Sequence, residues 1–393
     1  MDYIPLYHYL HKRFSLNQEF VELDEVGLSI RNFNFSSDPD ILDRENHYDF
    51  EESHPLYAIS DAKISENNEF RYSLVMPQHA KPTFDKVILL LHGLNERKWE
   101  KYLPWAASMV HQTGLPVVMF PISFHMDRAP EKWNDPRSIY PLLKQKAREE
   151  QFRFDTSTSI ANYALSERLI QSPGRFFTSG YQSINDVHHL IASIQEGIHP
   201  NFEKGTLVNI FAYSIGAFLT EILMIANPEG LLDQSRFVFF CGGALFSGIN
   251  PTSKYILNKT AFDRIQEYYL HELETKEVQK GIYGDILSEH PFGEAFRAMM
   301  CPHKFTAKRE KVFDFYSKNI KAITLKKDEV VPSKEVYQTF AHSFLKHRKQ
   351  VEELDFDYPY SHELPFDAKL TNYEERINRH YADFMNRSAT FLA

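Results

Sequence analysis

Short apolar runs recur along the chain and predict strands. The run Val87–Leu91 is continuously apolar, as expected of a parallel strand that is covered on both faces. Further strands are predicted at Phe70–Met76, Pro116–Phe120, Thr206–Phe211, Phe237–Cys241, Ile320–Leu325 and Val351–Phe356. Stretches with helical spacing follow most of these runs, at about Trp99–His111, Ile184–Ile194, Ala217–Ala226, and from Ser333 and Tyr373 onward. This alternation predicts the α/β class, with a mostly parallel central sheet and helices on both of its faces.

Three stretches of the chain depart from this alternation of strands and helices. Residues 1–68 are polar and lack strong periodicity, which favours an N-terminal arm that packs on a domain formed by residues 69–393. Residues 122–180 and 249–317 are too long for simple connections and carry helix-like patterns. Material that follows the carboxyl ends of strands overhangs the ligand crevice of an open α/β sheet. These two insertions are therefore candidates for a helical cap or lid.

Composition excludes several classes of partner. The 393 residues carry a net charge of -9, so no basic excess is present to neutralise a nucleic acid or an anionic membrane surface. No window approaches the roughly 20 apolar residues of a membrane span, and the N-terminus lacks the pattern of a signal peptide. Two cysteines, Cys241 and Cys301, cannot build a disulfide framework. We expect a cytoplasmic protein with a small-molecule partner.

Ser214 is the candidate nucleophile. It stands in the string Ala212-Tyr213-Ser214-Ile215-Gly216, directly after an apolar strand and before an apolar helix. A sharp strand-to-helix turn projects a serine hydroxyl from the scaffold, and it needs small residues two positions before and after the serine. Ala212 and Gly216 meet that need, although the consensus has glycine at the first position. The alternative is a serine that only caps the following helix.

A tetrahedral intermediate needs backbone N–H donors aimed at its oxygen. His92-Gly93 ends the first continuous apolar run, where a loop N–H can face the serine. We assign the N–H groups of Leu94 and Ile215 as the two donors of an oxyanion hole. The alternative is an ordinary glycine turn after a strand.

The acid and the base of such a site follow the serine in the order Asp or Glu, then His. Asp328 comes three residues after the Ile320–Leu325 strand, and His362 lies in the loop after the last strand. Both positions belong to the same sheet edge as Ser214. Glu329 and Asp355 compete with Asp328, and His380 falls in the terminal helix.

Together, these residues resemble the α/β-hydrolase superfamily, from about Phe70 to the C-terminus and outside the two insertions. The resemblance implies Ser214 as nucleophile, His362 as general base and then acid, and Asp328 orienting His362. It also implies no metal and no organic cofactor. A serine nucleophile points away from the branches of the superfamily that use Asp there.

The residues next to these positions are candidates to line a substrate pocket: His92, Gly93, Phe124, His125, Tyr213 and Gly243. His125 has an alternative as a structural histidine. No HExxH or CxxC string supports a metal site. The leading hypothesis is a carboxylic-ester hydrolase that forms an acyl-enzyme. Acyl transfer, or cleavage of a thioester or amide by the same residues, stays open, as does a binding protein that kept the fold without the chemistry.

Overall fold

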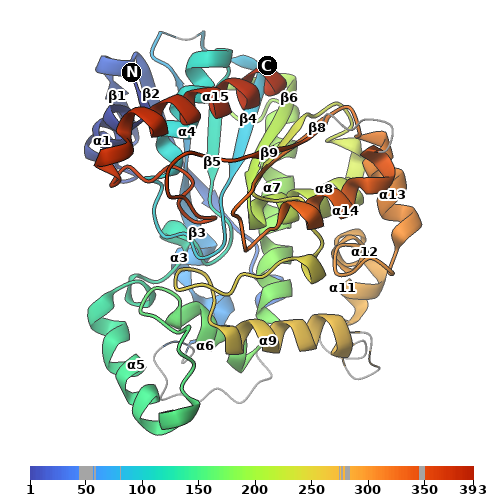
Figure 1. Cartoon of the computed structure of the whole chain (residues 1–393). Coiled ribbons are helices and arrows are strands. Elements are labelled where there is room, and N and C mark those ends of the chain that lie inside the picture. The colour runs from blue at the N-terminus through green and yellow to red at the C-terminus, as the bar shows by residue number, and fades with distance from the viewer. Residues whose placement is uncertain are drawn as a thin grey trace.

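The computed structural model describes residues 1–43, 56, 59–79, 81–273, 275, 278, 284–344 and 350–393. Within this part of the chain, a nine-stranded sheet has the strand order β1-β2-β3-β5-β4-β6-β7-β8-β9 (Figure 1). Its strands are β1 (Phe20–Leu23), β2 (Leu28–Ser36), β3 (Glu69–Pro77), β4 (Phe84–Leu91), β5 (Val117–Phe120), β6 (Phe202–Tyr213), β7 (Phe237–Phe240), β8 (Ile320–Leu325) and β9 (Val351–Leu354).

Strand direction divides the sheet into two parts. Strands β5, β4, β6, β7, β8 and β9 are parallel neighbours, whereas β1, β2 and β3 pair antiparallel and join the parallel part through β5. The strands predicted from the apolar runs correspond to β3 through β9. The predicted α/β class, with a mostly parallel sheet flanked by helices, is confirmed.

No pattern in the sequence identified β1 and β2, which lie in the stretch predicted as an N-terminal arm. Buried polar residues explain why. Asn32 of β2 is buried, and its side-chain amide donates hydrogen bonds to the carbonyl oxygens of Ser15 and Gln18, at 2.9 and 2.6 Å. Ser29 is also buried in β2. Polar residues that find partners inside the fold interrupt the alternation by which a strand is recognised.

Helices cover both faces of the sheet. One face packs against α1 (Tyr3–Arg13), α4 (Tyr102–Thr113) and α15 (Glu374–Leu392), and the other against α7 (Arg175–Gln195), α8 (Ile215–Ala226) and α14 (Ser333–Phe344). The side chains of strand β4 alternate between these two faces. Ile88 and Leu90 pack on the side of α1, α4 and α15, whereas Val87, Leu89 and Leu91 pack on the side of α7, α8 and α14. Helices α2 (Asp40–Asp43) and α3 (Ser65–Asn68) are short. No helix in the described ranges is both long and apolar enough to cross a membrane.

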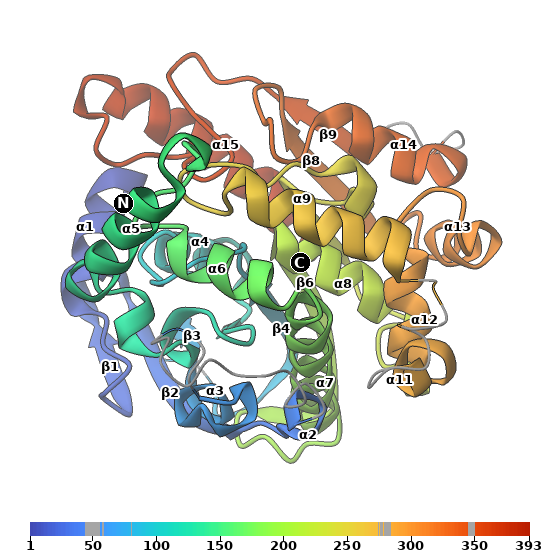
Figure 2. The same ribbon diagram turned by 90° about the horizontal axis from the view of Figure 1, so that it is seen from below.

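The two insertions are helical and contact each other. They contain α5 (Pro136–Glu150) and α6 (Tyr163–Gln171) in one, and α9 (Lys259–Glu267), α11 (Gly284–Glu289), α12 (Pro291–Ala298) and α13 (Thr306–Phe315) in the other. Figure 2 shows α5, α6 and α9 in front of the sheet when the molecule is seen from below. Asp155 accepts a hydrogen bond from Thr260 N at 2.8 Å, and Asn162 Nδ2 donates one to Ser253 O at 2.8 Å. Helices α12 and α13 pack instead against α8.

Candidate active site

Ser214 lies at the sharp turn between β6 and α8. Its backbone has φ 55° and ψ −119°, a strained conformation for a residue other than glycine. The turn depends on glycine neighbours. A Cβ atom on Gly216 would lie 2.8 Å from the carbonyl oxygen of Leu91, and one on Gly242 would lie 2.5 Å from Ala217 Cβ. Close packing of helix, strand and loop thus holds the serine in this strained position.

Ser214, His362 and Asp328 form a chain of hydrogen bonds. Ser214 Oγ lies 2.8 Å from His362 Nε2, and His362 Nδ1 lies 2.8 Å from Asp328 Oδ2. The three residues follow β6, β9 and β8, and all three are buried. A carboxylate accepts hydrogen bonds only, so Nδ1 carries the ring proton and Nε2 is left to accept from the hydroxyl. This arrangement can move a proton from Ser214 to His362.

Asp328 is fixed by the backbone that follows it. Its Oδ1 accepts hydrogen bonds from Val330 N at 2.9 Å and Val331 N at 2.8 Å, which leaves Oδ2 for His362. The competing residues lie elsewhere. Glu329 is exposed, Asp355 pairs with Lys326 at 3.0 Å, and His380 lies 2.7 Å from Asp357.

Two buried neighbours support this chain. The Tyr213 hydroxyl donates a hydrogen bond to the backbone oxygen of His362, and the two rings stack with centroids 5.5 Å apart. The Cys241 thiol contacts the Asp328 carboxylate, and burial together with that negative charge raises the pKa of the thiol well above its usual value. A protonated thiol can donate a hydrogen bond to Asp328.

Cys241, Asp328 and His362 also form a group whose ligand atoms lie within 4.8 Å of one another, close enough to be considered for a metal ion. However, the 2.8 Å contact between His362 Nδ1 and Asp328 Oδ2 is a hydrogen bond. A high pKa for the thiol also disfavours the thiolate that binds metals. The group fits proton transfer better than metal coordination.

The loop after β4 presents a backbone donor. His92 Nδ1 donates to Gly93 O at 2.9 Å and Nε2 accepts from Ile122 N at 3.0 Å, while burial lowers the pKa of His92 well below its usual value. The carbonyl and N–H of a trans peptide point in opposite directions. Because the Gly93 carbonyl faces the His92 ring, the Leu94 N–H points away from it. Within the described residues, the N–H groups of Leu94 and Ile215 have no hydrogen-bond partner.

Asn95 connects this loop to both insertions. Its backbone has φ 60°, and its Nδ2 donates to Ala161 O at 2.9 Å and to Tyr255 O at 2.6 Å. Nothing in the sequence singled out Asn95, since both of its partners are backbone oxygens of segments far away along the chain. The position of the Leu94 N–H is therefore coupled to the insertions.

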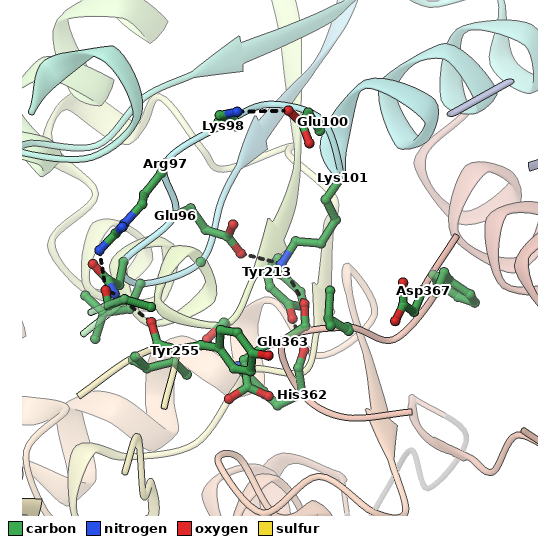
Figure 3. A pocket seen from close by; sticks show the side chains of 18 of the residues that line it. Glu96, Arg97, Lys98, Glu100, Lys101, Tyr213, Tyr255, His362, Glu363 and Asp367 are labelled. Atoms are coloured by element: carbon green, nitrogen blue, oxygen red, sulfur yellow. Dashed lines mark hydrogen bonds and ion pairs between the residues drawn. The ribbon is translucent and has the colours of Figure 1, made fainter. Parts of the chain in front are cut away.

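Two cavities meet at Ser214. The larger one, of about 590 Å³, is lined by His362, Tyr213, Gly93 and many polar side chains (Figure 3). The smaller one has a volume of about 30 Å³. Its lining consists of Ser214 and small or apolar residues: Leu94, Ile215, Phe218, Gly242, Gly243, Ala244, Ile249, Pro251, Ile256, Val330 and Val331.

The remaining pocket candidates lie farther from the serine. Phe124 and His125 line a separate cavity of about 60 Å³, which does not include Ser214. His125 Nδ1 lies 2.7 Å from Ser123 O, and burial lowers the pKa of His125 to about 4. His92 lines neither cavity at Ser214, because its ring is buried behind the Gly93 peptide. Tyr3 and Tyr7 of α1 do line the larger cavity, and no sequence pattern indicated this.

A family model matches residues 1–393, the whole chain, and its description reads "Family of unknown function (DUF6051)". The chain belongs to this family. A search of curated proteins finds no match.

Among solved structures, the chain is similar to several esterases. It is 12% identical to the esterase Est22, with a TM-score of 0.47, over 94% of this chain and 83% of that chain. A thermostable esterase from Pseudomonas putida ECU1011 is 10% identical, with a TM-score of 0.42 over 95% and 86% of the two chains. A cold-adapted esterase from an Arctic intertidal metagenomic library is 12% identical, with a TM-score of 0.39 over 95% and 99%. At these scores, the likeness carries no argument about the reaction.

Proposed function

We propose that this protein is a serine hydrolase that cleaves a carboxylic ester through an acyl-enzyme intermediate. The observation that carries the proposal is the hydrogen-bonded chain from Ser214 Oγ through His362 to Asp328, with 2.8 Å at each link. It starts at a strained serine that borders two cavities. A serine that only caps a helix needs neither the histidine nor the carboxylate.

In the first half of the reaction, Ser214 Oγ attacks the ester carbonyl carbon while His362 Nε2 takes the hydroxyl proton. The carbonyl oxygen becomes negative, and the N–H groups of Leu94 and Ile215 stabilise it. The bond to the leaving oxygen then breaks, and His362 gives its proton to that oxygen. Asp328 holds the histidine in the tautomer this requires.

In the second half, a water molecule takes the place of the alcohol. His362 removes a proton from the water, whose oxygen attacks the acyl-enzyme carbonyl. The bond to Ser214 Oγ breaks, the proton returns to Ser214, and the free acid leaves. We also propose that the two helical insertions act as a cap, because both contribute residues to the larger cavity, Asn134 and Ala161 from one and Tyr255 and Ile256 from the other.

Labelling with a fluorophosphonate probe tests the proposal, because the probe reacts covalently with an activated serine. We expect wild type to be labelled and Ser214→Ala to be unlabelled and to lose p-nitrophenyl acetate hydrolysis by roughly 10³-fold or more. Ser247→Ala is the matched control, since Ser247 is exposed and should leave both readouts unchanged. An unlabelled wild type, or a Ser214→Ala variant that still labels, would overturn the assignment.

A further inference from the structure

The two cavities at Ser214 differ in size and chemistry, and this difference indicates a substrate class. We propose that the substrate is a short-chain acyl ester, acetyl or propionyl, of a large polyhydroxylated alcohol such as a sugar. The inference rests on the proposed function and extends it to both sides of the scissile bond.

The position of His362 decides which cavity receives which part of the ester. The leaving oxygen must accept a proton from His362 Nε2, so the alcohol has to lie beside this histidine. Of the two cavities at Ser214, the larger is lined by His362 and the smaller is not. The acyl group therefore occupies the smaller cavity, next to Leu94 and Ile215. We name the two the alcohol cavity and the acyl cavity.

The acyl cavity has room for very few atoms. A cavity needs about 10–15 Å³ to hold one water molecule, so its volume of about 30 Å³ accommodates about two groups of that size. No ionisable side chain stands among its described lining residues. It therefore suits the methyl group of an acetyl ester or the ethyl group of a propionyl ester.

The acyl cavity shares three of its lining residues with a second small cavity. Leu94, Ile215 and Phe218 line both the acyl cavity and this neighbouring apolar cavity of about 50 Å³. Phe218 is buried, and the centroid of its ring lies 6.4 Å from the ring centroids of Phe176 and of Phe296. Its side chain therefore stands between two spaces that would otherwise join. A longer acyl chain would have to displace this packed ring.

The alcohol cavity is large, and the charges of the side chains that line it balance. Its acidic lining residues match its basic ones in number: Glu96, Glu100, Glu363 and Asp367 against Arg97, Lys98, Lys101 and Lys369. Several are paired, as Glu96 is with Lys101, and Lys98 with Glu100 at 3.4 Å (Figure 3). Such a lining gives no net attraction for a phosphate or an ammonium group.

The same lining offers hydrogen-bond donors and acceptors side by side, together with aromatic rings from Tyr7, Tyr213, Tyr255 and Phe366. A hydroxyl group both donates and accepts, so it can bind to either member of such pairs. A volume of about 590 Å³ lies in the range of small-molecule sites. An alcohol with many hydroxyl groups and an apolar ring face matches this surface. The reaction releases this alcohol and the short-chain acid, with water as the only co-substrate.

Acyl length is tested with p-nitrophenyl acetate, propionate, butyrate and octanoate. We expect kcat/KM to fall by about tenfold or more between acetate and butyrate. Phe218→Ala should join the two apolar spaces and raise the butyrate-to-acetate ratio by about tenfold. Phe292→Ala is the control, because Phe292 is similarly buried but lines neither space, so the ratio should stay unchanged. If Phe218→Ala does not fold, Ile249→Ala enlarges the acyl cavity from another side and should shift the ratio the same way.

The alcohol is tested by acetate release from glucose pentaacetate, ethyl acetate, acetylcholine and acetyl phosphate. We expect the sugar ester to have the highest kcat/KM, at least about tenfold above the charged esters. A preference for octanoate, acetylcholine or acetyl phosphate that depends on Ser214 would overturn this inference while leaving the proposed function standing. Absence of both labelling and hydrolysis would instead defeat the proposed function itself.

Discussion

A single residue, Tyr213, connects Ser214 with His362. It ends β6, one position before Ser214, and its hydroxyl donates a hydrogen bond to the His362 backbone while its ring stacks on the imidazole. The Lys101 ammonium lies 4.4 Å from the centre of the same ring. Tyr213 is thus placed to hold the His362 loop at the distance that proton transfer needs.

We expect Tyr213→Phe to lower kcat by roughly tenfold with little change in KM, because the stacked ring stays and only the tether to the His362 backbone is lost. The measurement is steady-state kinetics on p-nitrophenyl acetate, together with the rate of fluorophosphonate labelling. Tyr381→Phe is a matched control, since the buried Tyr381 hydroxyl donates to Pro104 O at 2.7 Å, in the packing of α15 on α4. A similar loss of kcat in both variants would show that Tyr213 is only structural.

Among the helices and strands, the site depends on how closely helix α8 approaches strand β4. Gly216 lies in the first turn of α8, and a methyl group there would stand 2.8 Å from Leu91 O and 2.9 Å from His92 O. Both oxygens belong to the backbone, so they cannot rotate aside as a flexible side chain would. The helix would have to move, and Ser214 and the Ile215 N–H would move with it.

Gly216→Ala is therefore expected to lower the free energy of unfolding by about 1–3 kcal/mol and to slow fluorophosphonate labelling strongly. Chemical denaturation and labelling kinetics measure the two effects. Gly180→Ala in α7 is the control, because a methyl group there meets no atom within 4 Å. It should raise stability by about 0.5–1 kcal/mol, since alanine favours a helix more than glycine does. Equal stability of Gly216→Ala and wild type would contradict the steric argument.

The elements also show what the sequence could predict. Parallel strands such as β4 are covered on both faces, so they appear as continuous apolar runs. Ser214, Asp328 and His362 each come after such a strand, β6, β8 and β9, which predicts that they share one edge of the sheet. Strand β2 stayed hidden because buried Asn32 breaks its alternation. The contribution of α1 to the alcohol cavity arises from packing between distant segments, which no local pattern records.

The whole molecule carries a carboxyl group in its interior that the proposed reaction does not use. Glu221 of α8 is fully buried, and neither of its carboxyl oxygens has a hydrogen-bond partner within the described residues. Burial raises the pKa of Glu221 well above the usual 4.5, and attraction to Arg309 offsets this only in part. The fold therefore favours the protonated form of this group more than the unfolded chain does, whose carboxyl ionises near pH 4.5.

This difference makes stability depend on pH through Glu221. Below pH 4.5 the carboxyl is neutral in both states and adds no penalty. As pH rises above 4.5, only the unfolded state releases the proton, so the folded state loses about 1.4 kcal/mol per pH unit until its own raised pKa is reached. Glu221→Gln has no proton to lose. The free energy of unfolding of this variant, minus that of wild type, should therefore be near zero at pH 4.5 and increase toward pH 7.5.

Urea denaturation of both proteins at pH 4.5, 6.0 and 7.5 measures this dependence, and taking the difference cancels the titration of all other groups. Glu267→Gln on α9 is the matched control, since Glu267 is exposed and the same change should give a difference that stays flat with pH. A flat difference for Glu221→Gln as well would mean that Glu221 ionises equally in the folded and unfolded states. A rise confined to Glu221→Gln would show that α8, the helix that follows Ser214, holds a buried acid in its protonated form at a measurable loss of stability near neutral pH.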